Sequence, residues 1–215
     1  MTRSGRTLKA RLKADAERYP DPLRIRLHRS ISWLGRAQSE SDDLDAQFIF
    51  LWIALNAAYA KEFGLQESER NRLADMHSAL VAIDHEQRLH KILFATFSGP
   101  IRTLLDNKFI FEPFWKSVRE HDSSERWKES FANSTKVALS AIMAGDTARV
   151  LSVVFDRLYV LRNQLVHGGA TWNSKVNRAQ LADATRILMA LVPAILELMM
   201  DHPELDFGPV MYPVI

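Results

Sequence analysis

The chain has 215 residues, of which 47% are hydrophobic and 25% charged, and this ordinary globular composition excludes a largely disordered protein. Its 28 Lys and Arg residues against 26 Asp and Glu leave a net charge of +2, which neither requires nor excludes nucleic acid as a partner. The absence of cysteine excludes disulfides, thiolate metal sites, iron–sulfur clusters and a cysteine nucleophile.

Length and hydropathy predict one cytoplasmic domain over residues 1–215. A chain of this size can close its own hydrophobic core. The first 20 residues carry charges every few positions, without an apolar stretch of signal-peptide length. The longest apolar run, FIFLWIALNAAYA, is shorter than the ~20 residues that span a bilayer and contains Asn56. We therefore expect a cytoplasmic protein that has no membrane partner.

The apolar pattern predicts an all-α fold, because apolar residues recur with the 3.6-residue period of amphipathic helices and strand signals are almost absent. Gly and Pro number only 8 each. The expected helices span, in chain order, residues 5–19, 23–37, 44–63, 73–105, a short segment after Pro113, 124–144, 147–166 and 177–200.

Turn and capping residues set the ends of the earlier helices. Pro20 stops the first helix, and its charged sequence makes residues 1–20 a candidate N-terminal appendage. The polar residues 39–43 supply an N-cap for the third helix, and Gly64 is its expected end. In the fourth, Ser98-Gly99-Pro100 predicts a break, so that 73–105 forms one interrupted helix or two shorter ones.

The residues that cap and end the later helices are clearer. Gly145 ends one helix and Asp146 caps the next, which Gly168 and the glycine after it then end. The last long helix contains Pro193, where a kink is expected. Between these helices and the first half, residues 107–122 are aromatic-rich and predict little more than a short helix.

The most specific segment is LYVLRNQLVHGGATWN, residues 158–173, which places three polar side chains at a helix end. At about 100° per residue, Asn163 and His167 share one helix face, since they are four residues apart. Arg162 is about 140° from His167 around the helix, yet its long side chain can swing toward the same place. The three side chains can therefore converge.

These residue types suit the cleavage of RNA. Arg162 offers a permanently charged fork that fits a phosphate, and neutral His167 can take up a proton near neutral pH. The ribose 2′-hydroxyl would be the nucleophile, with His167 as general base or acid, Arg162 stabilising charge on the phosphoryl oxygens and Asn163 orienting the groups. This route requires no metal and no cofactor, and it leaves a 2′,3′-cyclic phosphate and a 5′-hydroxyl.

A purely structural interpretation explains the same residues. Cationic side chains near a helix C-terminus complement the helix dipole, and Gly168 is an ordinary residue at the end of a helix. Arg and His fall this close together in many helices by chance. Spacing alone therefore favours the structural interpretation over the catalytic one.

The segment RNQLVHGG nevertheless resembles the Arg-x4–6-His motif of the HEPN (higher eukaryote and prokaryote nucleotide-binding) superfamily, including the polar residue directly after the arginine. The apolar helix FIFLWIALNAAYA upstream is similar to one that bacterial HEPN proteins often carry ahead of the motif. The resemblance covers most of residues 23–200. It implies an up-and-down helical bundle of HEPN type, here with additional helices, and a homodimer whose two motifs form a composite ribonuclease site.

Two functions follow from the resemblance. The first is a metal-independent endoribonuclease with Arg162, Asn163 and His167 as catalytic residues, acting as a toxin or defence protein on RNA, with an antitoxin or a nucleotidyltransferase as a further partner. The second is a non-catalytic HEPN module that binds protein or nucleotide partners, since members of one fold can lose activity and keep the scaffold.

Other residues near the motif are candidates for binding substrate. Trp172 can stack on a base or cover the helix end, and Lys175 and Arg178 can contact phosphates or remain solvated. Asn56, inside the most apolar helix, needs a partner if it is buried, either in the motif or at a backbone carbonyl. No metal site is expected: HEQRLH spaces its histidines five apart, unlike the four of a zinc-protease helix.

Overall fold

The computed structural model of the chain describes residues 4–59, 69–210 and 212, and for residues 69–74 the backbone alone. The fold is all-helical, as the sequence predicts. Within the described ranges, no helix combines the length and the apolar character that crossing a membrane requires. The α-helices, in chain order, are α1 (Gly5–Ala14), α2 (Asp21–Ser39), α3 (Leu44–Tyr59), α4 (Glu69–Ile83), α5 (Arg88–His90), α6 (Ser98–Leu105), α7 (Glu112–Arg119), α8 (Arg126–Ala144), α9 (Thr147–Val166) and α10 (Arg178–Asp201).

Several helix ends lie where local chemistry places them. The side chain of Asp43 accepts a hydrogen bond from the Ala46 amide at 3.0 Å and so caps α3. Asp146 caps α9 in the same way, accepting from the Arg149 amide at 3.0 Å. The expected end of α3 at Gly64 lies outside the described residues, and α10 continues through Pro193.

The prediction for residues 73–105 missed one interruption. α4 ends at Ile83, and the carboxylate of Asp84 accepts from the backbone amides of Arg88 and Leu89 at 2.8 and 2.7 Å. Gln87, the residue before Arg88, has a left-handed backbone, with φ +55°. These two hydrogen bonds to the Asp84 side chain start α5. Helix α5 then runs directly into a π-helix over Lys91–Thr96. The second break lies at Phe97, next to the expected Ser98.

Helix α1 is packed into the bundle and is not an appendage. Its Leu8 and Leu12 are buried against α2 and belong to the main hydrophobic core. At the other end of the chain, the Asp201 carboxylate in α10 binds Arg11 of α1 at 2.7 Å and Arg88 of α5 at 2.5 Å. Burial would raise the pKa of Asp201, but these two guanidinium groups outweigh burial and lower it.

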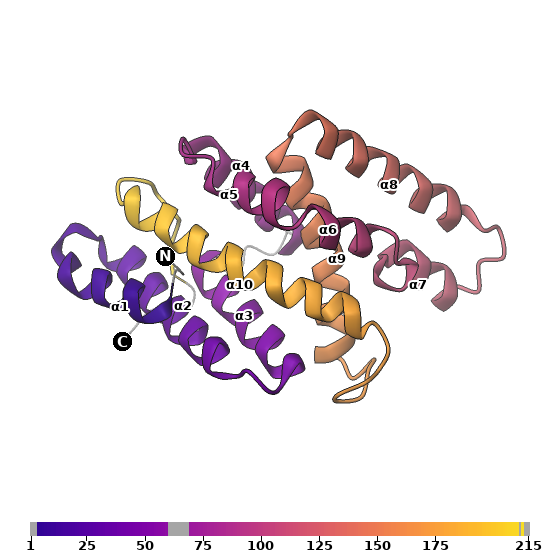
Figure 1. Cartoon of the computed structure of the whole chain (residues 1–215), viewed down its shortest axis with the longest axis horizontal. Coiled ribbons are helices and arrows are strands. Elements are labelled where there is room, and N and C mark those ends of the chain that lie inside the picture. The colour runs from indigo at the N-terminus through magenta and orange to yellow at the C-terminus, as the bar shows by residue number, and fades with distance from the viewer. Residues whose placement is uncertain (1–3, 60–68, 211, 213–215) are drawn as a thin grey trace.

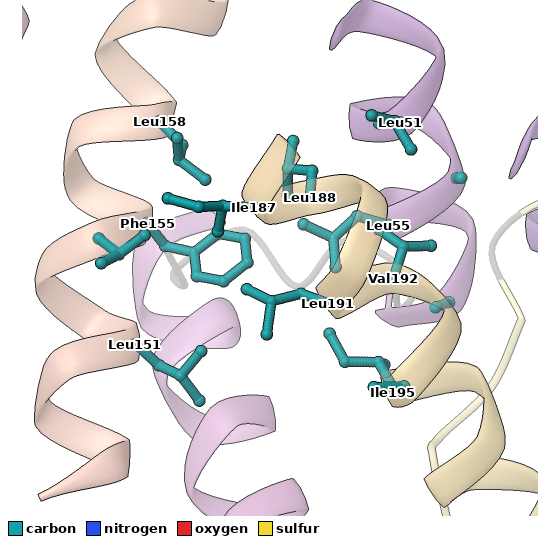
Figure 2. Close-up of a cluster of buried hydrophobic side chains, with 14 of the residues drawn as sticks. Leu51, Leu55, Leu151, Phe155, Leu158, Ile187, Leu188, Leu191, Val192 and Ile195 are labelled. Carbon is teal, nitrogen blue, oxygen red and sulfur yellow. The ribbon is translucent and has the colours of Figure 1, made fainter. Parts of the chain in front are cut away.

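The core lies around α10, which crosses the middle of the molecule between α1–α3 and α6–α9 (Figure 1). Its buried face holds Leu188 and Leu191, both fully inaccessible to solvent. Figure 2 shows these side chains beside Leu55 of α3 and Phe155 of α9. Helices α3, α9 and α10 therefore share one apolar centre, and this packing fixes the position of the C-terminal end of α9, where the motif lies.

Candidate functional site

The motif lies at the last turn of α9. His167 caps the helix, and its backbone amide still donates to the Asn163 carbonyl at 3.0 Å. Because this i to i+4 bond keeps the helical geometry, the side chains of Asn163 and His167 leave the same face of the helix. Gly168 then takes a left-handed backbone, with φ +69°, which a residue without a Cβ adopts at little cost. The glycine therefore ends the helix immediately after the motif.

Arg162 and Asn163 contact each other directly. The Arg162 Nη1 atom donates to Asn163 Oδ1 at 2.8 Å, and both residues are half-buried. The Arg162 guanidinium carbon also lies 5.5 Å from the ring centroid of Tyr159 and 5.9 Å from that of Trp52 on α3. Such contacts hold a guanidinium in place without neutralising its charge. The cation is therefore positioned beside Asn163 between α3 and α9.

His167 differs from Arg162 in being exposed. Across residues 4–59, 69–210 and 212, its imidazole has no hydrogen-bond or ion-pair partner. An accessible imidazole with both nitrogens available can exchange protons with an incoming ligand. The predicted trio thus combines a positioned cation, an amide bound to that cation and an open imidazole at one helix end.

Two acidic residues at the start of α3 tether the loop that follows the motif. Asp43 Oδ2 accepts from the indole nitrogen of Trp172 at 2.8 Å, and Asp45 Oδ2 accepts from Arg178 Nη1 at 2.5 Å. Asp45 also accepts from the Asn173 amide at 3.3 Å. The hydrogen bonds from the Ala46 amide and then from Trp172 lower the pKa of Asp43, so this carboxylate stays charged.

A chain of hydrogen-bonded side-chain amides connects the motif to neighbouring segments. Gln164 donates to the Phe109 carbonyl at 2.7 Å and accepts from Asn177 at 3.1 Å. Asn177 in turn accepts from Asn107 at 3.0 Å. These bonds join the end of α9 to the segment before α7 and to the start of α10. They hold the motif relative to both neighbours, and no sequence pattern predicted them.

The remaining predicted residues take different positions. The Trp172 side chain is exposed, with 74% of the residue accessible, although its indole nitrogen is bound to Asp43. Lys175 is also exposed, whereas the guanidinium of Arg178 is occupied by Asp45. Asn56 is half-buried, and its Oδ1 accepts from the Tyr59 hydroxyl at 2.8 Å. The described hydrogen bond of Asn56 is thus with Tyr59, neither with the motif nor with a backbone carbonyl.

The histidines of HEQRLH do not share a helix face. His85 lies in the turn between α4 and α5, and His90 is half-buried with Nδ1 3.0 Å from the Thr147 hydroxyl. In the part of the chain that the structure describes, no three His, Asp or Glu side chains gather in an arrangement that could hold a metal ion.

Removing the Asp45 tether should loosen the loop after the motif. We expect Asp45→Ala to lower the free energy of unfolding by about 1–3 kcal/mol, because it leaves a partly buried guanidinium without its carboxylate. Denaturant unfolding measures this change. Asp42→Ala is the matched control, since Asp42 is an exposed neighbour whose described hydrogen bond is with Ser41. Equal effects of the two substitutions would contradict the tether.

Comparisons with protein-family models, with curated proteins and with solved structures find no significant match for this chain.

Proposed function

We propose that the chain is a HEPN-type, metal-independent endoribonuclease that acts as a homodimer. The observation that carries the proposal is the exposed His167 imidazole on the same helix face as Asn163, whose side chain binds the Arg162 guanidinium. This set supplies the proton exchange and the fixed positive charge that RNA cleavage through the 2′-hydroxyl needs. The resemblance of RNQLVHGG to the HEPN motif supplies the choice of reaction.

In the proposed reaction, the 2′-oxygen attacks the adjacent phosphorus and the bond from phosphorus to the 5′-oxygen breaks. A general base takes the proton of the 2′-hydroxyl, and a general acid gives a proton to the leaving 5′-oxygen. His167 of one protomer and His167 of its partner fill these two roles in a composite site. Arg162 stabilises the negative charge that develops on the phosphoryl oxygens, and Asn163 keeps its guanidinium oriented.

A different observation favours the second function, a non-catalytic module. The Arg162 guanidinium already has contacts within its own protomer, to Asn163, Tyr159 and Trp52. Such contacts are sufficient for a structural role at the end of a helix, in which the surface around the motif recruits protein or nucleotide partners. In that case, the loss of the His167 side chain would change the binding of such a partner and would have no effect on RNA cleavage.

The test is an incubation of the purified protein with a pool of structured RNAs in EDTA, followed by mapping of new ends. The endoribonuclease predicts cleavage that EDTA does not inhibit, with 2′,3′-cyclic phosphate and 5′-hydroxyl ends. Light scattering of the same sample is expected to give the mass of a dimer. Cleavage that depends on added metal, or ends that carry a 5′-phosphate, would contradict the proposal.

A toxin or defence role also belongs to the proposal, with an antitoxin or a nucleotidyltransferase as the expected further partner. The resemblance to HEPN proteins carries this part. Expression of the wild-type chain is then expected to slow growth of a bacterial host more than expression of His167→Ala at equal protein level.

A further inference from the structure

Helices α1 and α2 cross closely and leave a groove beside the crossing. A Cβ atom added to Gly5 would lie 3.2 Å from the backbone of Gly35, so only glycine allows this approach without adjustment. Two hollows of about 760 and 450 Å³ lie along the pair of helices. They share Lys9, Leu12 and His28 as lining residues. The two hollows therefore adjoin, and we call them together the α1–α2 groove.

The α1–α2 groove is lined by cations. Its basic residues are Arg6, Lys9, Lys13, Arg24, His28 and Arg29. No Asp or Glu is among the described residues that line either hollow. Arg24 pairs with Asp21, and Arg29 donates to the Tyr212 carbonyl. By contrast, Arg6, Lys9 and Lys13 are exposed and have no hydrogen-bond or ion-pair partner within the described ranges, so their charges are available to a ligand.

One end of the groove lies toward the loop of residues 168–177 between α9 and α10, which we call the motif loop. The groove is lined there by Gln38 and Ser39, the last residues of α2. Four residues after Ser39, Asp43 holds the indole of Trp172. The turn between α2 and α3 and the loop between α9 and α10 lie at the same edge of the molecule in Figure 1. The α2 end of the groove and the loop that carries the exposed Trp172 therefore lie on the same edge of the molecule.

We propose that the α1–α2 groove binds the phosphate backbone of single-stranded RNA and guides the strand to Trp172. Protein grooves that bind single strands combine a positively charged track with aromatic side chains on which bases stack. Lys9, Lys13 and Arg6 form the track, and Trp172, which is 74% exposed and held to Asp43 by its indole nitrogen, is the stacking platform. The groove would be the entry path for the substrate of the proposed endoribonuclease. Its role in cleavage therefore rests on that proposed function, whereas the binding of RNA by the groove does not.

The test measures binding in the absence of cleavage. The His167→Ala protein is titrated into a fluorescently labelled single-stranded RNA, and anisotropy is followed at several salt concentrations. Lys9→Glu/Lys13→Glu is expected to weaken binding on the order of tenfold and to lower the slope of log K against log salt by roughly 0.7 for each lost phosphate contact. Lys116→Glu/Lys136→Glu is the matched control, because it makes the same charge change on α7 and α8, at the opposite end of the molecule from α1 (Figure 1).

A second variant blocks the groove without changing its charge. A Cβ atom at Gly35 would meet no atom within 4 Å, and Gly35 lines the groove, so Gly35→Met adds a side chain there without a clash of its Cβ. We expect this variant to keep the thermal stability of the parent and to bind RNA more weakly. RNA affinity that is unchanged in both groove variants, or lowered equally by the control, would overturn the proposal.

Two further outcomes separate this inference from the proposed function. RNA binding that depends on the groove in a protein that cuts no RNA would support the groove and contradict the endoribonuclease. Cleavage by the wild type together with unaltered RNA binding in the groove variants would support the endoribonuclease and contradict the groove. Tighter binding of polyglutamate than of RNA at equal salt would also overturn the RNA assignment, because it would make an acidic polypeptide the preferred ligand.

Discussion

Replacing His167 with alanine is expected to lower the rate of RNA cleavage at least 100-fold, because a positioned general acid or base contributes roughly 10²- to 10⁴-fold. The side chain is exposed at the C-terminal end of α9 and has no described partner in the fold, so its removal should leave the free energy of unfolding unchanged. Single-turnover cleavage and denaturant unfolding of the same preparations measure the two quantities. A loss of cleavage without a loss of stability is the expected combination.

The controls separate this role from general effects of losing a histidine. His85→Ala removes an exposed histidine from the turn after α4 and is expected to cleave RNA at the wild-type rate. Arg162→Lys keeps the charge at the motif but removes the planar fork that bonds Asn163, so an intermediate rate is expected. A His167→Ala protein that cleaves as fast as the wild type would contradict a role of this imidazole in the reaction.

His77 is expected to make the fold sensitive to acid. This residue of α4 is 2% exposed, and its ring lies 4.4 Å from that of Phe155 on α9. Neither ring nitrogen has a hydrogen-bond partner within the described residues. Burial lowers the pKa of His77 to about 3, well below the value of 6.5 that applies in an unfolded chain.

The sign of the pH effect follows from these two values. Above pH 6.5 the imidazole is neutral in both states, and His77 leaves stability independent of pH. Between pH 6.5 and about 3 the unfolded chain binds a proton that the folded chain does not. The free energy of unfolding therefore falls as the pH falls through this window, by about 1.4 kcal/mol for each pH unit.

Denaturant unfolding from about pH 7.5 down to about pH 4.5 measures this dependence. His77→Phe replaces the ring with one that does not titrate. The free energy of unfolding of this variant should therefore fall less steeply with acid than that of the wild type, by about 1.4 kcal/mol for each pH unit. His85→Ala again serves as the control, because it removes an exposed histidine instead of a buried one. Parallel curves for the wild type and His77→Phe would contradict the buried neutral imidazole.

The helix carrying the motif could be predicted because its determinants are local. Asp146 caps α9 through the amide three residues later, and Gly168 ends it through its own backbone geometry. The placement of Asn163 and His167 on one face followed from helical periodicity alone. The class of the fold followed from the same periodicity, repeated along the chain.

The tether of the motif loop could not be predicted in this way. Trp172 and Asp43 are 129 positions apart, and Arg178 and Asp45 are 133 apart. Residues 39–43 could be predicted to cap a helix, but no local pattern indicates that Asp43 also binds the loop. Arg178 was therefore predicted as a candidate for binding substrate, whereas its described ion pair is with Asp45.

Buried cations were missed for a similar reason, since charged residues are usually exposed. Arg157 on α9 is 2% exposed, with its guanidinium carbon 4.4 Å from the ring centroid of Phe111 and 5.5 Å from that of Phe131. Burial lowers its pKa to about 10. The available signal was the aromatic content of residues 107–122, which includes Phe111, one of the two rings that Arg157 packs against.

The most direct test of the proposed reaction compares two RNAs that differ by one oxygen. Once a cleaved position is mapped, the same RNA is prepared with a 2′-deoxy nucleotide on the 5′ side of that phosphate, and both are incubated with the wild-type protein in EDTA. Attack by the 2′-hydroxyl predicts that the all-ribose RNA is cut, leaving a 2′,3′-cyclic phosphate, and that the substituted position is not cut at all. Cleavage of the substituted position would show that the nucleophile lies elsewhere, and the reaction assigned to Arg162, Asn163 and His167 would be wrong.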